Sequence, residues 1–550
     1  MKYKLVFVFI SCVLFGYSFH KKPKLEIFVR QCEFVCDYPF NDTTKWAITC
    51  RVWGLLKYFH PNVTAGTLDW DKVLLDRLDA VNSASSPEAV NTELEKMLDA
   101  AGKYSYIKGD EEWVDFLSMN VNLCWLDNSY LDKTLREELK KIASLPVKRP
   151  SYYGLDFETV MIQNEKEYVS CYADTSYKYQ LLTLFRYWNV IYYYSPHKYL
   201  MDESWDKILA ESVFPFFNAT DKQSLETALL KLATSLNDGH AFIFNVDDYP
   251  YKEEYQYIIE KVEGKTIIRT DAGGLNKGDI INCIEETDIN CIRDSLSALI
   301  PASTQGNKEY RINCAVAKMM FSNETDVTVA RNDRILKIHT SPVTSGKPYT
   351  GSFKRISDKT AYVDISFLIT EEIDSMFQSF SDVSGVIFDL RKSGPNFFDY
   401  ILFCCHLNKD VIRMEPFIFN NFEHPGSFYM TEGFSVPNSG KCPQFKKKMV
   451  FLINEFSQSF YETVALNART NLHATLIGRP TSGALGRIVK VPLPGNYTAC
   501  FSGVGLFSHD GTELQRKGII PDIEVHPSLE SIKAGKDEIL EAAIEYFNNQ

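Results

Sequence analysis

Two stretches of the chain repeat one another at a constant separation of 135 residues (188 − 53 and 205 − 70). The run Arg51-Val-Trp-Gly-Leu-Leu-Lys-Tyr-Phe-His-Pro61 corresponds to Arg186-Tyr-Trp-Asn-Val-Ile-Tyr-Tyr-Tyr-Ser-Pro196, and Trp70-Asp-Lys-Val-Leu74 corresponds to Trp205-Asp-Lys-Ile-Leu209. Apolar residues in each copy recur at helical spacing, which predicts amphipathic helices. One offset held over about 45 residues indicates a duplicated helical unit, whose tryptophans we expect to anchor its core.

The two copies differ at their ends. The second copy ends in Asp238-Gly239-His240, whereas the first has Lys103-Tyr-Ser105 at the matching place. The pattern predicts a helix that ends at a glycine turn, followed by a β-like run. A histidine at such a junction can be rigidly held and still exposed.

Residues 252–300 change in character. The run Ile258–Ile268 alternates like a hairpin, Gly274–Ile284 predicts a turn and a strand, and Ile292–Leu299 predicts a short helix. This order resembles a small PDZ-like module, whose exposed strand edge can bind an extended peptide. A compact structural insert is the alternative.

From about residue 350 onward, predicted strands and helices alternate, which favours an α/β core. The expected strands are Thr360–Ile365, Ser384–Arg391, Lys448–Asn454 and Thr475–Gly478, and the expected helices are Glu371–Phe380, Asn396–Leu407 and Ser459–Asn471.

The N-terminus has the form of a secretory signal peptide. Lys2 and Lys4 precede an apolar run over 5–16, and small residues flank Tyr17, so we expect cleavage after Ser18. The run is shorter than the roughly 20 residues that a membrane span needs. We therefore expect a protein that is secreted, or periplasmic in the cell envelope, with an uncleaved anchor as the alternative.

The composition sets limits on the class of protein. Of 550 residues, 45% are hydrophobic and 24% charged, as in folded globular proteins. The formal net charge of −12 argues against nucleic acid as a partner. Thirteen cysteines are too sparse for a disulfide scaffold. Cys32 and Cys36 are close enough for a local bridge, and Cys404-Cys405, in an apolar run, is expected to pack as free thiols. We expect no metal and no cofactor, because no paired Cys-x-x-Cys and no His-Glu-x-x-His occurs.

Chemistry could reside at two turns that follow buried strands. One strand turns through Asn454-Glu-Phe-Ser-Gln-Ser459 into a helix, where a serine can expose its oxygen near the positive helix N-terminus. Ser459 also suits an N-cap, and Ser457 competes for either role. The other strand ends in Asp389-Leu-Arg391-Lys-Ser-Gly394, a glycine turn that can aim a backbone N–H at a neighbouring strand.

Taken in order, these pieces resemble the S41 family of serine peptidases, the C-terminal processing and tricorn-core enzymes. The matching motifs cover roughly residues 180–527. They are Asp238-Gly-His240, the PDZ-like segment, Asp389-Leu-Arg391-x-x-Gly394, Ser457-x-Ser459-x-x-Glu462, Gly478-x-x-Thr481-x-Gly483 and Gly518-Ile-x-Pro521-Asp522. The tandem helical repeat resembles the N-terminal part of secreted Bacteroides-type members.

The resemblance implies a serine nucleophile and, for this sequence, a histidine base. The processing branch of the family uses a lysine after the second glycine of Gly-x-x-Thr-x-Gly, where this chain has Ala484. Alanine cannot accept a proton, so that dyad is missing. The tricorn-like branch uses a histidine that His240 matches. The resemblance therefore assigns Ser459 as nucleophile and His240 as general base.

The resemblance also assigns the oxyanion hole and the third member of the triad. The backbone N–H groups of Gly394 and Phe460 would bind the oxyanion. The tricorn pattern has a glutamate three residues before Gly518, where this chain has Gln515, whose carbonyl can hold a histidine without adding negative charge. Glu513 is the alternative, and Glu462 is expected to be a positioning carboxylate.

The expected fold is a multidomain α+β protein. We expect a signal peptide over 1–18, helical repeat units over 19–150 and 151–250, a PDZ-like module over 251–300, and an α/β, ClpP/crotonase-like S41 catalytic domain over 301–550. The predicted function is a secreted serine endopeptidase acting on polypeptides through an acyl-enzyme. The alternatives are a catalytically weak or inactive peptide- or lipid-binding relative and a structural envelope protein.

Overall fold

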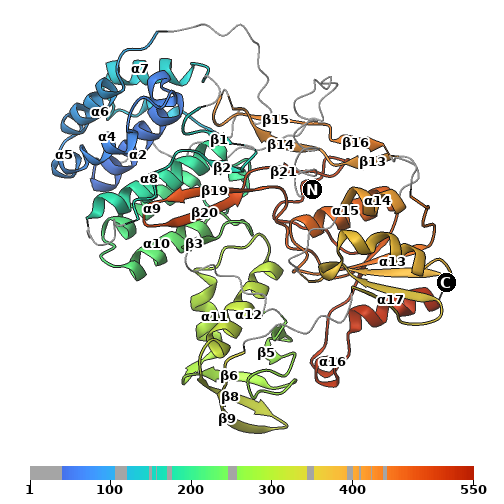
Figure 1. The fold of residues 1–550 in the computed structure, drawn as a ribbon. Coiled ribbons are helices and arrows are strands. Elements are labelled where there is room, and N and C mark those ends of the chain that lie inside the picture. Colours follow the sequence, from blue (N-terminus) through green and yellow to red (C-terminus); the bar gives the residue numbers. More distant parts are fainter. Residues whose placement is uncertain are drawn as a thin grey trace.

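The computed structural model describes residues 40–105, 121–147, 151–156, 158–169, 176–245, 255, 257–343, 352–392, 400–407, 411–422, 424–437 and 442–549. Along the described chain, a helical part comes first, followed by a small sheet unit and then a larger mixed α/β part (Figure 1). The predicted Cys32–Cys36 bridge and the signal peptide lie outside the described residues. No helix in the described ranges is long and apolar enough to cross a membrane.

The helical part contains two sets of helices with corresponding positions in the 135-residue offset. The first set is α2 (Asp42–Phe59), α4 (Trp70–Leu75) and α6 (Pro87–Ala101), and the second is α8 (Tyr177–Tyr194), α9 (Trp205–Phe217) and α10 (Lys222–Thr234). The tryptophans are buried, as expected for core anchors.

The tryptophans of each set bond reciprocally. The indole N–H of Trp53 donates to the carbonyl of Trp70 at 3.2 Å, and that of Trp70 donates back to Trp53 at 3.1 Å. Trp188 and Trp205 make the same exchange at 2.8 and 3.0 Å. The buried indole N–H groups are thereby satisfied inside an apolar core.

Ion pairs cross between the two sets. Arg51 of α2 pairs with Asp206 of α9 at 2.5 Å, and Arg186 of α8 pairs with Asp71 of α4 at 2.7 Å. Each arginine thus finds its carboxylate in the other set. The α2–α8 contact is also close, because a Cβ on Gly54 would overlap the side chain of Asn189.

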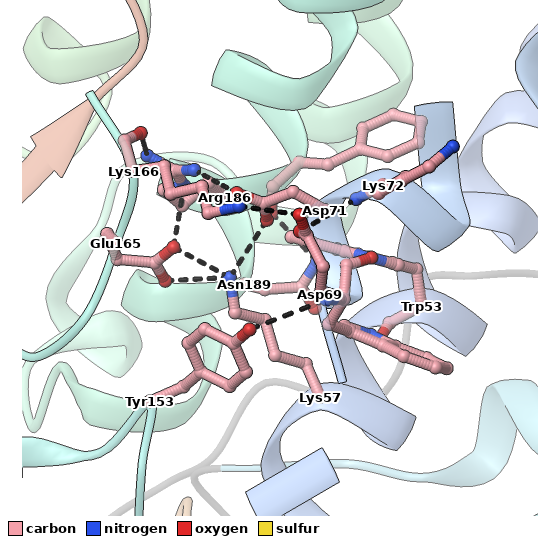
Figure 2. Close-up of polar contacts among 12 residues, drawn as sticks. Trp53, Lys57, Asp69, Asp71, Lys72, Tyr153, Glu165, Lys166, Arg186 and Asn189 are labelled. Carbon is pink, nitrogen blue, oxygen red and sulfur yellow. Dashed lines mark hydrogen bonds and ion pairs between the residues drawn. The ribbon is translucent and has the colours of Figure 1, made fainter. Parts of the chain in front are cut away.

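One of these pairs belongs to a larger buried charge cluster, drawn in Figure 2. Lys57 lies 2.7 Å from Glu165 and 3.5 Å from Asp71, and the Arg186 guanidinium also lies 2.9 Å from Glu165. Arg186 donates to the carbonyl of Pro492, far along the chain, at 2.9 Å. Two cations and two anions therefore balance in the interior, where an uncompensated charge would be costly.

A second unit contains a sheet in the strand order β4-β5-β6-β8-β9. Its elements are β4 (Ile259–Val262), β5 (Lys265–Ile268), β6 (Ile280–Ile284), α11 (Ile289–Ser297), α12 (Gln305–Phe321), β8 (Thr325–Arg331) and β9 (Arg334–Thr340). Because β8 and β9 continue this sheet, the expected boundary at residue 300 falls inside the unit.

The α/β part is built on a sheet in the order β10-β11-β12-β17-β18-β22. Its strands are β10 (Phe353–Arg355), β11 (Thr360–Asp364), β12 (Gly385–Asp389), β17 (Lys448–Ile453), β18 (Thr475–Gly478) and β22 (Ile523–Glu524), parallel except for β10. Apolar residues of α13 (Ile373–Ser379), α14 (Tyr400–Leu407) and α15 (Phe460–Leu472) cover one face and those of α17 (Glu538–Asn548) the other (Figure 1).

A hairpin from the C-terminal part lies against the helical part. β19 (Ile488–Leu493) and β20 (Tyr497–Ser502) form the centre of the sheet β1-β2-β19-β20-β3. β2 (Met161–Ile162) and β3 (Ile243–Asn245), on either side, come from the segment before residue 250. The sheet therefore joins distant parts of the sequence, and β3 begins just after His240.

The expectation for one cysteine pair is wrong. Cys405, at the end of α14, forms a disulfide with Cys442, so only Cys404 of the two neighbours is a buried free thiol. Adjacent residues of a helix point in different directions, and Cys404 faces the sheet while Cys405 reaches the returning chain. The partner could not be read from the apolar run itself.

Candidate active site

Ser459 lies at the turn between β17 and α15, as its N-cap. Its backbone has φ 56° and ψ −111°, a conformation that non-glycine residues rarely adopt and that costs about 1–3 kcal/mol. Two acceptors hold its N–H, the Glu462 carboxylate at 3.0 Å and the carbonyl of Ala484 at 3.1 Å. The side chain is half-buried. A strained, firmly held serine at a strand-to-helix turn is suited to present its hydroxyl.

Ser457 has a different environment. It is fully buried, and its hydroxyl donates to the carbonyl of Leu390 at 2.8 Å. It also accepts the N–H of Asn454 at 3.2 Å. This hydroxyl therefore ties the turn to the end of β12, which leaves Ser459 as the more exposed of the two candidate serines.

The Asp238-Gly-His240 segment lies against the Ser459 turn. Gln458, the residue before Ser459, donates to the carbonyl of Gly239, the residue before His240, at 3.0 Å. Arg311 of α12 donates to the same carbonyl. The fold thus brings together the two motifs that the sequence places 219 residues apart (459 − 240). No hydrogen bond between Ser459 Oγ and His240 joins these two described residues.

The His240 ring is buried, and its two nitrogens differ. Nδ1 lies 2.9 Å from the hydroxyl of Ser502, at the end of β20, while Nε2 has no hydrogen-bond partner among the described residues. Burial lowers the pKa of His240 from 6.5 to about 4, Asp238 opposes this shift, and Arg311 adds to it. The imidazole is therefore neutral near pH 7, with Nε2 available for a further contact.

The two candidates for the third member occupy different places. Gln515 is buried beside Asp238, to which its amide donates at 3.1 Å, while its carbonyl accepts the N–H of Leu485 at 3.1 Å. Glu513 accepts from the hydroxyl of Tyr199. In the described contacts, the hydrogen-bond partner of His240 Nδ1 is Ser502 instead.

Ala484 stands where the processing branch would have its lysine. Its Cβ lies 2.8 Å from the position that a Cβ on Gly239 would occupy. A longer side chain here would meet the segment that carries His240. In this chain the space is filled by the histidine-bearing turn.

Glu462 is a fully buried carboxylate one turn into α15. It accepts hydrogen bonds from the N–H groups of Ser459, Gly483 (2.7 Å) and Ala484 (3.1 Å), and from the hydroxyl of Thr481 (2.6 Å). Burial raises its pKa from 4.5 to about 7, against the opposing effect of these bonds. Its contacts are those of a residue that holds the turn, as expected for a positioning carboxylate.

The end of β12 is fixed next to the same turn. Asp389 accepts from the backbone N–H of Arg391 at 2.9 Å and from its guanidinium at 2.7 and 2.9 Å. The hydroxyl of Tyr257 donates to the carbonyl of Arg391 at 2.6 Å. Gly394 lies outside the described residues. Phe460, the other expected oxyanion donor, is the first residue of α15, where the helix dipole favours negative charge.

A group of three or more His, Cys, Asp or Glu side chains able to hold a metal ion is not found within the described ranges. The chemistry of the site therefore has to be considered from its serine, histidine and carboxylate groups.

The sequence of the α/β part matches a family model. Residues 359–525 match the model of Peptidase family S41, and this segment includes β11, β12, β17 and the Ser459 turn. The chain belongs to peptidase family S41. This S41 chain is accordingly a hydrolase that cleaves peptide bonds, with polypeptide as its class of substrate.

Solved structures of similar fold accompany that match. The structure of mature CPAF complexed with lactacystin has a TM-score of 0.53 at 12% identity, over 68% of this S41 chain and 99% of that chain. The photosystem II D1 C-terminal processing protease has a TM-score of 0.39 at 15% identity, over 65% and 98%. At 12% identity, the likeness to CPAF shows the fold alone. No curated protein sequence matches this chain.

Sequence reasoning missed three residues of this S41 site. Ser502, which contacts His240, lies in a strand that was not predicted and has no motif of its own. Gln458 and Arg311 bring the base segment to the serine turn. The position of Gln458 next to Ser459 was the one available signal.

Proposed function

We propose that the chain is a serine endopeptidase in which Ser459 is the nucleophile and His240 the general base. The observation that carries the proposal is the hydrogen bond between Gln458 and Gly239, because it joins the residues immediately before the two catalytic groups. The strained backbone of Ser459 and the unpartnered Nε2 of His240 support the same roles.

The mechanism follows the usual order of acyl transfer. Ser459 Oγ attacks the carbonyl carbon of the scissile peptide while His240 Nε2 takes the hydroxyl proton. The C–N bond then breaks, and the proton passes to the departing amine nitrogen. Water, deprotonated by His240, attacks the acyl-enzyme, releases the carboxylic acid product and returns the proton to Ser459 Oγ.

The developing oxyanion needs donors close to the Ser459 turn. The N–H of Phe460 and that of Gly394 are the expected pair. The anchoring of Asp389 and Arg391 supports this proposal, because it fixes the strand end from which the segment with Gly394 continues.

The inactive relative was considered because Gln515 carries no charge. Gln515 bonds to Asp238 and not to His240, so a neutral residue at this position does not leave the histidine without an acid neighbour. We therefore retain the active enzyme as the proposed function.

Export of the chain is a further proposal. The basic and apolar N-terminal run supports a signal peptide. The Cys405–Cys442 disulfide supports an oxidising compartment such as the periplasm or the exterior. Expression with a periplasmic export system and N-terminal sequencing of the mature protein should place Phe19 first; a mature chain that begins at Met1 would contradict cleavage.

Two finer assignments also remain proposals. The unit formed by β4 to β9 with α11 and α12 is proposed to be PDZ-like and to bind extended peptide at a strand edge. The helical units are proposed to descend from a duplication. The reciprocal ion pairs of Arg51 and Arg186 support this proposal, because both pairs obey the 135-residue offset.

A fluorophosphonate probe tests the catalytic roles. The wild-type protein should be labelled at neutral pH, and mass spectrometry should place the adduct on Ser459. Ser459→Ala should abolish labelling. Ser457→Ala is the matched control and should still be labelled, since its hydroxyl binds Leu390. A folded wild-type protein that is not labelled, or an adduct on Ser457, would disprove the assignment.

A further inference from the structure

The hydroxyl of Ser502 connects His240 to a carboxylate. It donates to Asp238 Oδ1 at 2.8 Å and lies 2.9 Å from His240 Nδ1. A serine hydroxyl has one proton, and here that proton is directed to the carboxylate. The oxygen must therefore accept the Nδ1–H of His240, which leaves the lone pair of the neutral ring on Nε2.

Asp238 is held as an anion by the donors around it. Oδ1 accepts from the hydroxyl of Ser502, from the backbone N–H of His240 at 2.9 Å and from the amide of Gln515 at 3.1 Å. Oδ2 accepts the backbone N–H of Ser502 at 2.6 Å. All four contacts use the carboxylate as an acceptor, as an ionised group requires.

We propose that Asp238, acting through the hydroxyl of Ser502, is the acid partner that orients His240 and stabilises its imidazolium form. The proposal rests on the function proposed above, in which His240 is the base. Ser502 and Asp238 are positioning residues, because they act through His240 and do not touch the reacting atoms.

This arrangement gives Gln515 a supporting role. Its amide donates to Asp238, and its carbonyl is already occupied by Leu485 N–H. A neutral amide suits this place, because a carboxylate there would face Asp238 across about 3 Å and repel it.

The charged groups around the ring define what a pH profile should report. Asp238 raises the pKa of His240, and Arg311 lowers it. His197, a buried histidine in the turn after α8, interacts with both Asp238 and His240. Removal of the Asp238 charge should therefore move the acidic limb of the labelling rate to a lower pH. Loss of packing alone would not move this limb.

The first experiment measures fluorophosphonate labelling by its maximal rate and its half-saturating concentration. Ser502→Ala should lower the maximal rate about 10- to 100-fold, the usual effect of losing a residue that orients a catalytic ligand or base, with half-saturation unchanged. Ser502→Thr keeps the hydroxyl and should restore most of the rate. Thr498→Ala, four residues away in the same strand, should behave like the wild type. An unchanged rate in Ser502→Ala would overturn the proposal.

Gln515→Glu separates this proposal from the pattern of the tricorn-like branch. If residue 515 were the acid partner of His240, the new carboxylate would raise the labelling rate. If Asp238 is that partner, the variant should be slower than the wild type. A faster variant would overturn the proposal.

A second readout does not depend on activity. Nitrogen-15 NMR of histidine-labelled wild-type protein should show His240 neutral with its proton on Nδ1, and Ser502→Ala should lose this preference. A wild-type protein that shows the Nδ1–H form but is never labelled would refute the proposed peptidase mechanism and leave the Ser502 relay standing. A labelled protein with the proton on Nε2 would do the reverse.

Discussion

The guanidinium of Arg51 lies 2.5 Å from the carboxylate of Asp206, which comes from the other set of helices. The arginine side chain is buried, and the aspartate is largely so. Removing one member of a buried pair leaves the other charge without its counter-ion, which destabilises proteins strongly. We expect Asp206→Ala to lower the free energy of unfolding by about 3 kcal/mol, measured from the denaturant midpoint of far-ultraviolet circular dichroism.

A surface pair provides the control for that measurement. Lys72 and Asp76 are 2.7 Å apart, but both are more than half exposed. Asp76→Ala should change the free energy of unfolding by less than about 1 kcal/mol. Equal effects of the two substitutions would show that the pair between the helix sets contributes no more than a solvated one.

Gly239 offers a test of how closely the base segment must fit. A Cβ at this position would lie 2.8 Å from Ala484 Cβ and 3.0 Å from Asn307 Oδ1. Gly239→Ala should therefore displace His240 and lower the labelling rate by about 100-fold, the effect of a misplacement of about 1 Å. The double variant with Ala484→Gly removes the closer contact and should recover part of the rate. No recovery would mean that Ala484 does not set the position of the segment.

The pH dependence of labelling follows from the burial of His240. Its pKa is lowered from 6.5 to about 4, so the base remains neutral well below the usual range. The labelling rate should keep its plateau as the pH falls and decline near pH 4. The same shift makes the folded protein lose stability between pH 6.5 and about 4, because the unfolded chain binds a proton there that the folded chain does not. Circular dichroism at each pH separates unfolding from titration; a decline centred at pH 6.5 would contradict the shift.

Glu462 should be sensitive to a change that preserves its size. Its two oxygens accept three backbone N–H groups and one hydroxyl. In Glu462→Gln, an amide NH2 would face donors, which leaves buried N–H groups unsatisfied at about 1–3 kcal/mol. The melting temperature should fall, and labelling of Ser459 should fall with it. A variant as stable as the wild type would show that these bonds do not hold the turn.

The Cys405–Cys442 disulfide closes a loop with a sequence separation of 37 residues. The loop-entropy model gives about 4 kcal/mol for a loop of this size. Dithiothreitol should therefore lower the melting temperature of the wild type. It should leave that of Cys405→Ala/Cys442→Ala, already lowered, unchanged. A wild-type melting temperature that does not respond to the reductant would contradict this prediction.

Local patterns could predict much of the fold. The strand Lys448–Ile453 and the helix that begins at Phe460 follow from an apolar run, a polar turn and helical spacing, all within about 25 residues. The 135-residue offset likewise gave the paired helices. Such features depend on near neighbours in the sequence.

Contacts between distant segments could not be predicted in the same way. The meeting of Ser502 with His240 depends on the pairing of β20 with β3, and the short strand β3 has little pattern of its own. The Cys405–Cys442 bond depends on where the chain returns after β16 (Phe434–Pro437). The S41 resemblance supplied the nucleophile and base candidates, but it directed attention to residue 515 instead of Asp238.

The β19–β20 hairpin has a consequence for the evolution of the chain. It lies in the C-terminal half of the sequence, yet β2 and β3 border it, and its last residue holds the ring of His240. A recombination event that transferred only residues 359–525 to a new host would carry a hairpin without its flanking strands and Ser502 without its histidine. Segments of this chain are therefore poor candidates for shuffling as cassettes, and both halves should be inherited together.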